Sequence, residues 1–314
     1  MGTQALSPDA VLDHALGDIQ DHGRVQQGMQ RLVDDLEVLR QRLPRSEWVD
    51  VCGSVCRRHP LLDVVHQDPL TALTYSRGSD RAPDSVFLSF AFDALEAELS
   101  LGRATDLGRE ICGFTRQSQV VLSARRRREV LAYLIDQLAA SGRRPSVLAF
   151  GCGDLKEADL SHTVRTGGLS RFLALLETEA ARRAIEASVG HLGVATGIAT
   201  VHDWIEGHGV GHEQEFDLAY SAGPFDVLSP ATAALLALAL FRSLKPGGTL
   251  VVANLARGIR EVGYAEAFMD WHTVYRDPRE MFAVASRIPE AWIADRRSFA
   301  AEGGRVSFLV VRRT

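Results

Sequence analysis

The chain has 314 residues, of which 46% are hydrophobic and 24% charged, and its formal net charge is −5. A chain of this length and apolar content can bury a large core, as two domains or as one domain with a large appendage, which excludes a disordered or fibrous protein. The negative net charge argues against a protein built to coat nucleic acid.

The first 140 residues show helical patterns. Ser7, Pro8 and Asp9 form a typical helix start, and apolar residues then recur at helical spacing until Pro44. Three further helices are predicted: Glu47–Arg58, Ser85–Leu101 and Ser123–Ala140. The polar stretch Ser76–Asp84 between them is typical of a loop.

After about residue 145 the pattern changes to short apolar runs separated by helical segments such as Glu179–Val189 and Ala231–Leu244. Five such runs are predicted to be strands: 147–150, 172–176, 197–201, 216–220 and 249–253. Buried strands that alternate with helices indicate a parallel sheet covered on both faces. Two final runs, Trp292–Phe299 and Arg305–Arg312, predict a hairpin that adds an antiparallel strand at the end of the sheet.

Three features at strand ends predict an adenosine site. The first strand runs into Gly151-Cys152-Gly153, which brings backbone close to a ligand at the carboxyl edge of the sheet. Glu177 follows the second strand and can accept hydrogen bonds from two ribose hydroxyls. Asp203 follows the third run and can accept from an adenine amino group.

The glycine pattern does not fit the common nucleotide fingerprints. A pyrophosphate fingerprint needs a third glycine at position 156, which is Lys156, and no Gly-Lys-Ser/Thr loop is present. The turn Lys245-Pro246-Gly247-Gly248 before an apolar strand, and the closing hairpin, point to a different adenosine cofactor.

These segments resemble the class I S-adenosylmethionine-dependent methyltransferases. Val147–Glu157 is similar to their first motif, and Glu177 to the acid after their second strand. Phe216–Leu228 and Leu244–Leu255 are similar to their fourth- and fifth-strand motifs. The resemblance implies an α/β, Rossmann-like fold, with a parallel sheet and a terminal antiparallel strand, and S-adenosyl-L-methionine as the cofactor.

A narrower resemblance covers residues from about 55 to 314. It is carried by four segments: His59–Phe92, Cys152–Glu157, Tyr220–Gly223 and Phe268–Arg276. They resemble a subgroup that makes hydroxy-fatty-acid methyl esters as extracellular signals and has a helical region before the Rossmann-like domain. The subgroup's Lys-Pro-Arg-Gly-Tyr-x-Gly-Asp loop is replaced here by Tyr75–Ser79 and a longer Asp80–Asp84. No acceptor is therefore carried over from the subgroup.

Combined with this resemblance, the sequence predicts a helical, substrate-capping lid over residues 1–140 and a cofactor domain over residues 141–314. Twelve residues in the loops after the strands are predicted to bind the cofactor: Gly151, Cys152, Gly153, Glu157, Glu177, Thr178, His202, Asp203, Trp204, Ser221, Ala222 and Gly223.

Methyl transfer from a sulfonium requires mainly in-line alignment of the acceptor. A carboxylate acceptor is already ionised, whereas a hydroxyl or an amine needs a general base. The predicted catalytic residues are Tyr220, Asn254, Tyr275 and Asp270. Further candidates for the base are His162, His202 and His272. Alternatively, Asp270 and Arg276 form a structural ion pair on a helix. The two tyrosines could instead bond to the cofactor's amino-acid end or present an aromatic face to the sulfonium, a role ranked below plain packing.

Three other groups of residues are given structural interpretations. His208, His212 and Glu213 could suggest a metal, but the glycines between them favour an exposed loop, and no metal site is predicted. The run Arg125–Arg128 could grip an anion, but a solvated helix start is preferred. The sequence contains four cysteines, predicted to be reduced and partly buried: Cys52, Cys56, Cys112 and Cys152.

Targeting signals and membrane spans are not expected. Residues 1–13 lack a basic segment followed by an apolar run, and the most apolar run, Ala231–Phe241, is too short to span a bilayer. We therefore expect a cytoplasmic protein that acts on a small molecule, without a nucleic-acid or membrane partner. A homodimer is left open.

Three functions follow from this sequence. The first is a methyltransferase for a small carboxylate or hydroxy acid of specialised metabolism. The second is a cyclase, in which the cofactor's own amino group attacks its Cγ, releases methylthioadenosine and closes an azetidine ring. That route needs an acceptor for the amino group, such as Asn254, Ser221 or Tyr220. The third is a non-catalytic protein that binds the cofactor.

Overall fold

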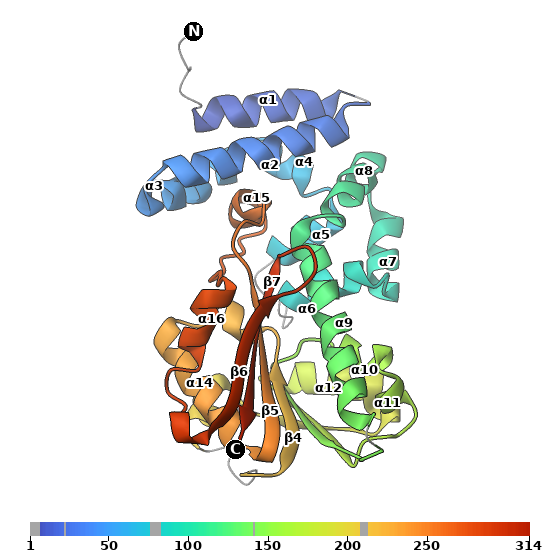
Figure 1. The fold of residues 1–314 in the computed structure, drawn as a ribbon. Coiled ribbons are helices and arrows are strands. Elements are labelled where there is room, and N and C mark those ends of the chain that lie inside the picture. The colour runs from blue at the N-terminus through green and yellow to red at the C-terminus, as the bar shows by residue number, and fades with distance from the viewer. Residues whose placement is uncertain (1–6, 22, 76–82, 141, 208–212) are drawn as a thin grey trace. The chain divides into compact units, whose positions relative to one another are not determined.

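The structure is a computed structural model that describes residues 7–21, 23–75, 83–140, 142–207 and 213–314 (Figure 1). The chain divides into two compact units. The helical unit comprises Met1–Ser79, Ser85–Ala124 and Gly258–His272. The sheet unit comprises Asp80–Asp84, Arg125–Arg257 and Thr273–Thr314. This division differs from a single boundary at residue 140, because Gly258–His272 joins the helices and the helix that begins at Gln119 contributes to both units.

The helical unit confirms the predicted helical character of the N-terminal region. Its helices are α1 (Pro8–Gln20), α2 (Val25–Arg42), α3 (Arg45–Asp50), a π-helix (Val51–Cys56), α4 (Leu61–Val65), α5 (Pro69–Tyr75), α6 (Pro83–Ala91), α7 (Leu95–Arg103), α8 (Asp106–Thr115), the start of α9 (Gln119–Ala139) and α15 (Val262–Phe268). Ser7 caps α1 as expected, because its hydroxyl accepts a hydrogen bond from Ala10 N at 3.2 Å.

Two predicted helices of this region are interrupted. The segment Ser85–Leu101 contains two helices, and Asp93 between them has a left-handed backbone (φ +49°). The segment Glu47–Arg58 passes from α3 into the π-helix. The predicted loop Ser76–Asp84 lies mostly outside the described residues, which resume at residue 83. Hydrophobic periodicity indicated the helices but not these local breaks.

The sheet unit contains seven strands in the order β3-β2-β1-β4-β5-β7-β6. They are β1 (Ser146–Phe150), β2 (Arg171–Leu176), β3 (Val194–Ile198), β4 (Phe216–Ser221), β5 (Leu244–Leu255), β6 (Ile293–Ala300) and β7 (Val306–Arg313). The first five are parallel to one another, and β7 pairs antiparallel with both β5 and β6. The predicted Rossmann-like α/β class and the terminal antiparallel strand are confirmed.

The third strand lies three residues before its predicted position. Val201, expected at the strand's end, instead begins α13 (Val201–Ile205), because Thr200 caps that helix. The strand pattern was weak there because β3 is an edge strand with only Val194 fully buried. Its edge position explains the missing run of apolar residues.

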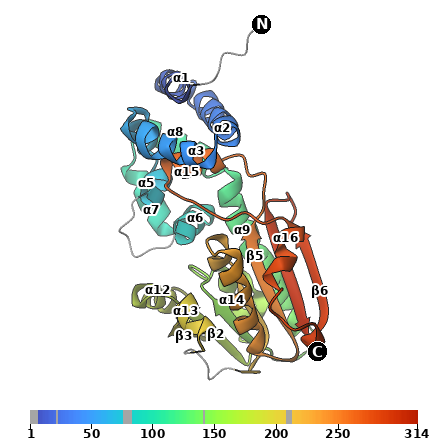
Figure 2. The same cartoon turned by 90° about the vertical axis from the view of Figure 1, so that its left-hand side faces the viewer.

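Helices cover both faces of the sheet (Figure 2). They are α9, α10 (Lys156–Leu160), α11 (His162–Arg165) and α12 (Glu179–Val189) on one face, and α13, α14 (Pro230–Arg242) and α16 (Pro278–Val284) on the other. Ala149 and Tyr220 face the first layer, whereas Phe150 and Val252 face the second. No helix among the described residues is both long and apolar enough to cross a membrane.

Candidate active site

The strand order places a candidate site at the carboxyl edge of β1. The chain passes from β1 to β2 and β3 on one side and to β4 and β5 on the other, so the connections diverge beside β1. In open α/β sheets a ligand binds at this switch point. The loops after β1, β2 and β4 begin at Gly151, Glu177 and Ala222, and the registers Phe150↔Leu175 and Phe150↔Ser221 bring them side by side.

The loop after β1 has a left-handed backbone at Gly151 (φ +60°), Gly153 (φ +53°) and Leu155 (φ +55°). Gly151 N also donates to Leu175 O at 2.9 Å, which ties the loop to β2. A Cβ at Gly151 would lie 2.4 Å from Cγ of Pro224. The sequence predicted that the glycine backbone approaches a ligand here. In the structure, Pro224 occupies the space that a Cβ at Gly151 would need. Gly151 therefore lets two loops of the site pack together.

The acid after β2 is available to a ligand. Glu177 is exposed, and no group among the described residues donates a hydrogen bond to it. Partial desolvation by the surrounding protein raises the pKa of its carboxyl. Thr178, by contrast, accepts a hydrogen bond from Ala181 N at 3.1 Å and caps α12. Glu177 thus retains the acceptor capacity that a ribose diol would use.

The residues after β3 have structural contacts. The Asp203 carboxylate accepts hydrogen bonds from Thr200 N at 3.1 Å and Thr200 Oγ1 at 2.7 Å, which completes a capping box for α13. His202 is largely exposed and lies 3.2 Å from Glu206. Trp204 is buried and packs on Phe150, with ring centroids 5.6 Å apart. The predicted adenine contact of Asp203 stays a prediction, and its cap is a role that sequence reasoning missed.

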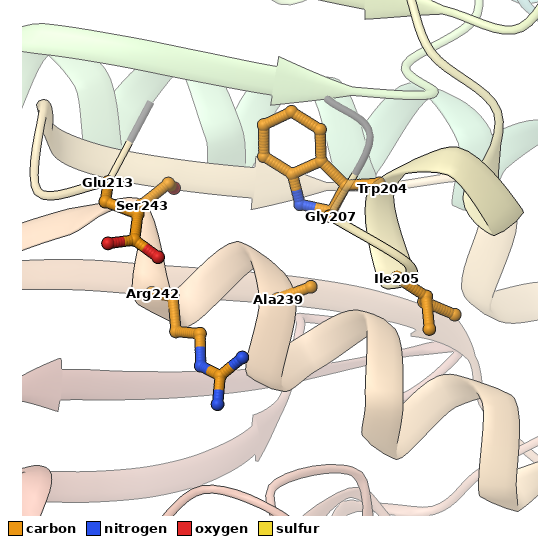
Figure 3. A pocket seen from close by; sticks show the side chains of 7 residues that line it. All are labelled: Trp204, Ile205, Gly207, Glu213, Ala239, Arg242 and Ser243. Atoms are coloured by element: carbon orange, nitrogen blue, oxygen red, sulfur yellow. The ribbon is translucent and has the colours of Figure 1, made fainter. Parts of the chain in front are cut away.

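Trp204 also lines a small hollow of about 50 Å³ (Figure 3). The other lining residues are Ile205, Gly207, Glu213, Ala239, Arg242 and Ser243. Ser243 O accepts a hydrogen bond from Phe216 N at 3.0 Å, at the first residue of β4. The hollow therefore lies near the amino end of β4, away from the candidate site, and its size suits only a few water molecules.

A buried hydroxyl lies at the end of β4. Ser221 is fully buried, and its Oγ has no hydrogen-bond partner among the described residues. A buried polar atom without a partner costs free energy unless a ligand or water satisfies it. Ala222 and Gly223 continue the loop, and Ala222 O accepts a hydrogen bond from Arg127. Ser221 is thus a polar group of the site that the protein itself leaves unsatisfied.

Two buried arginines of α9 hold the site loops. Arg127 Nη1 donates to Asp226 Oδ2 at 2.8 Å. Arg128 Nε lies 3.2 Å from Glu157 Oε2, and its Nη2 donates to Cys152 O at 3.5 Å. Both arginine side chains are at most 1% exposed. The interpretation of Arg125–Arg128 as a wholly solvated helix start was therefore wrong.

Tyr220 and Glu157 belong to the same buried network. The Tyr220 hydroxyl donates to Glu157 Oε1 at 2.8 Å, and both residues are 0% exposed. Burial, followed by the nearby negative charge of Glu157, raises the pKa of Tyr220 well above its usual value. Tyr220 therefore keeps its proton at neutral pH. Cys152 is also buried, and its thiol donates to Phe150 O at 3.4 Å.

Asn254 fixes the segment that begins at Thr273. Its amide donates to Val274 O at 2.7 Å and Leu255 O at 3.0 Å, and its Oδ1 accepts from Arg276 Nη1 at 2.5 Å. Val274 N in turn donates to Asp226 O at 2.6 Å. The side chain predicted to bind a substrate amino group is thus engaged with the protein. Tyr275 belongs to this segment and is partly buried.

Asp270 belongs to the helical unit, where it has a left-handed backbone (φ +49°). Its carboxylate lies 3.2 Å from Arg57 Nη2 and 3.2 Å from His272 Nε2. The suggested Asp270–Arg276 ion pair on a helix was wrong, because residues 269–277 are not helical and Arg276 bonds to Asn254 and to backbone carbonyls.

The remaining sequence candidates do not form a further centre. His208 and His212 lie outside the described residues, and within the described ranges no three His, Cys, Asp or Glu side chains could hold a metal ion. All four cysteines are buried free thiols, and burial raises the pKa of Cys56 to about 12. Burial likewise raises the pKa of Cys52 and Cys112, so these three cysteines offer no reactive thiolate at neutral pH.

Comparisons with known proteins support the fold. No family model matches the chain, and no curated protein matches it. A possible exported protein from Bordetella parapertussis is 16% identical, with a TM-score of 0.53 over 80% of this chain and 95% of that one. A S-adenosylmethionine-dependent methyltransferase from Mesorhizobium loti is 16% identical, with a TM-score of 0.42 over 58% of this chain and 96% of that one. A TehB-like S-adenosylmethionine-dependent methyltransferase from Corynebacterium glutamicum is 16% identical, with a TM-score of 0.41 over 60% and 88%.

Proposed function

We propose that the sheet unit binds S-adenosyl-L-methionine at the carboxyl edge of β1, β2 and β4, and that the chain is a methyltransferase for a small carboxylate or hydroxy acid. One observation carries the proposal. A left-handed glycine loop, a carboxylate to which no described residue donates and a buried hydroxyl with no partner among the described residues lie at the switch point of the sheet.

Each of these groups suits a part of this cofactor. Glu177 would accept hydrogen bonds from the ribose hydroxyls, and the loop at Gly151–Gly153 would pass along the nucleoside. Ser221 Oγ would gain the partner it lacks in the protein. The bound sulfonium supplies an activated methyl group, so the protein's task is to align an acceptor.

We propose a carboxylate acceptor because two of the four predicted catalytic residues, Tyr220 and Asn254, offer no general base. Tyr220 keeps its proton, and the Asn254 amide is engaged with Val274 and Arg276. Neither group can act as a general base, which a hydroxyl or amine acceptor would need. A carboxylate acceptor is ionised at neutral pH and needs none.

Other parts of the proposal rest on the sequence alone. We propose that the helical unit caps the acceptor and that the protein acts in the cytoplasm, in specialised metabolism. We also propose that the resemblance to extracellular-signal synthases extends to the cofactor but not to the acceptor. The cyclase reaction remains the second candidate. Among its suggested acceptors for the amino group, only Ser221 has no partner within the part of the chain that the structure describes.

The nucleoside product tests these functions. The full chain is incubated with S-adenosylmethionine alone, and then with a panel of short carboxylic and hydroxy acids, and the released nucleoside is identified by chromatography. S-adenosylhomocysteine that forms only with an added acid supports the methyltransferase. Methylthioadenosine formed without an acceptor overturns it in favour of the cyclase, and tight binding without either product identifies a non-catalytic protein.

A matched pair of variants locates the site. Glu177→Ala should weaken cofactor binding at least tenfold, because the ribose loses its acceptor. Glu179→Ala removes a partly exposed acid two residues later, whose carboxylate pairs with Arg182 and Arg183. Equal affinities in the two variants would contradict the placement of the ribose.

A further inference from the structure

A buried charge pair contacts the glycine loop. Arg128 of α9 and Glu157 of α10 are both 0% exposed, with Nε and Oε2 3.2 Å apart. Tyr220, the penultimate residue of β4, donates to the second carboxylate oxygen of Glu157 at 2.8 Å. The three side chains therefore join one helix, the start of a second and a central strand.

This network contacts the candidate site through the backbone. Arg128 Nη2 donates to Cys152 O, between the two glycines of the loop, and Tyr220 directly precedes the unpartnered Ser221. Glu157 follows Gly153 by four residues, in the first turn of α10. Its complete burial means that it acts on a ligand through its charge and through the loop rather than by an exposed contact.

The charges matter because both are removed from water. A buried ion pair is costly to form, and loss of one partner leaves the other uncompensated. Water screens such a charge poorly, so its field extends to a ligand in the adjoining loop. A cationic ligand and its neutral counterpart should therefore respond differently to changes in this pair.

We propose that the Arg128–Glu157 pair determines how strongly the site distinguishes the cationic sulfonium of S-adenosylmethionine from the neutral thioether of S-adenosylhomocysteine. Glu157 offsets the positive charge of Arg128, which would otherwise repel the sulfonium. This inference rests on the proposed function, and it assigns Glu157 and Arg128 as specificity-determining residues and Tyr220 as a positioning residue.

The test measures the dissociation constants of both nucleosides by titration calorimetry on full-length variants. Glu157→Gln removes the buried negative charge 3.2 Å from Arg128 and should weaken S-adenosylmethionine about tenfold more than S-adenosylhomocysteine. A tenfold change corresponds to about 1.4 kcal/mol, which is the interaction of two unit charges about 12 Å apart at an effective dielectric constant of about 20. Arg128→Met should shift the ratio in the opposite direction.

Two further variants separate charge from structural damage. Tyr220→Phe removes the hydrogen bond but no charge, so it should leave the affinity ratio within about twofold of the original. The double variant Glu157→Gln with Arg128→Met removes both charges and should restore the original ratio. If one single variant does not fold, the shift of the ratio in the other single variant, and its reversal in the double variant, decide the matter. Equal weakening of both ligands in every charge variant would overturn the proposal. If the unmodified protein binds neither nucleoside, the proposed function itself fails.

Discussion

Gly151 provides a quantitative test of how the two site loops fit together. In Gly151→Ala the new Cβ would lie 2.4 Å from Pro224 Cγ and 3.0 Å from Pro224 Cδ. The left-handed backbone at this residue adds about 1–2 kcal/mol for any residue with a Cβ. Overpacking against the proline ring adds about 1–3 kcal/mol. Gly151→Ala should therefore lower the free energy of unfolding by about 2–5 kcal/mol.

Removal of the Pro224 ring should recover only the part of the unfolding free energy that is lost to overpacking. Cβ of Pro224 lies 3.8 Å from the added methyl, an ordinary van der Waals contact, so Pro224→Ala relieves the clash. In the double variant the loss should fall to the backbone cost of about 1–2 kcal/mol. Urea unfolding of the four proteins of this cycle gives the coupling between the two positions. Additive losses, with no coupling, would refute the explanation of Gly151 by Pro224.

The same variants separate protein packing from ligand contact. If the glycine is needed only because of Pro224, the double variant should bind S-adenosylmethionine about as well as Pro224→Ala does. If the cofactor itself needs the space, binding should remain lost in the double variant even though its stability recovers. The larger side chain of Gly151→Val should abolish binding on either explanation, so alanine is the more informative replacement.

Three further predictions concern side chains of the sheet unit. Thr200→Ala should destabilise the protein by about 1 kcal/mol in thermal unfolding, because α13 loses its cap; no change would contradict the capping role of this threonine. Burial opposes ionisation of Asp217, but hydrogen bonds from Lys245 and Ser146 lower the pKa of its carboxyl in the folded protein. The ionised carboxylate therefore stabilises the fold fully above the unfolded pKa of about 3.9. This contribution is lost as the pH falls through the lower pKa of the folded state. Asp217→Asn should thus be less stable than the original protein at pH 7, with a deficit that shrinks in urea titrations at pH 3, whereas a constant deficit would refute this assignment. Asn254→Leu should cost about 2–4 kcal/mol in urea unfolding, because Arg276 and Val274 lose buried hydrogen bonds, and a neutral result would free Asn254 for a role toward the substrate.

The sheet could be predicted because its central strands are buried on both faces. Val147–Phe150 and Phe172–Leu176 are continuous apolar runs, and the structure places them within one residue of the predicted bounds. The edge strand β3 lacks that pattern, and its position was therefore wrong by three residues. The helix breaks at Asp93 and in the π-helix have no signal in hydrophobic periodicity.

The site residues at the strand ends could be predicted from the sequence, but the buried ion pairs that hold the site loops could not. Gly151 and Glu177 were found because strand ends mark the carboxyl edge of a parallel sheet. The ion pairs of Arg127 and Arg128 were missed, since two adjacent arginines near Glu129 also fit a solvated helix, and their partners lie 99 and 29 residues away in the sequence. The engagement of Asn254 with Val274 and Arg276 likewise depends on tertiary contacts that the sequence does not reveal.

The central claim is that a nucleoside cofactor binds at the carboxyl edge of β1, β2 and β4. A crystal structure of the full chain with S-adenosylhomocysteine tests it most directly. We predict that the ribose lies against Glu177, the nucleoside along the loop at Gly151–Gly153, and a polar group of the ligand or an ordered water on Ser221 Oγ. A nucleoside bound elsewhere, for example in the hollow beside Trp204, or no bound nucleoside at saturating concentration, would contradict the claim.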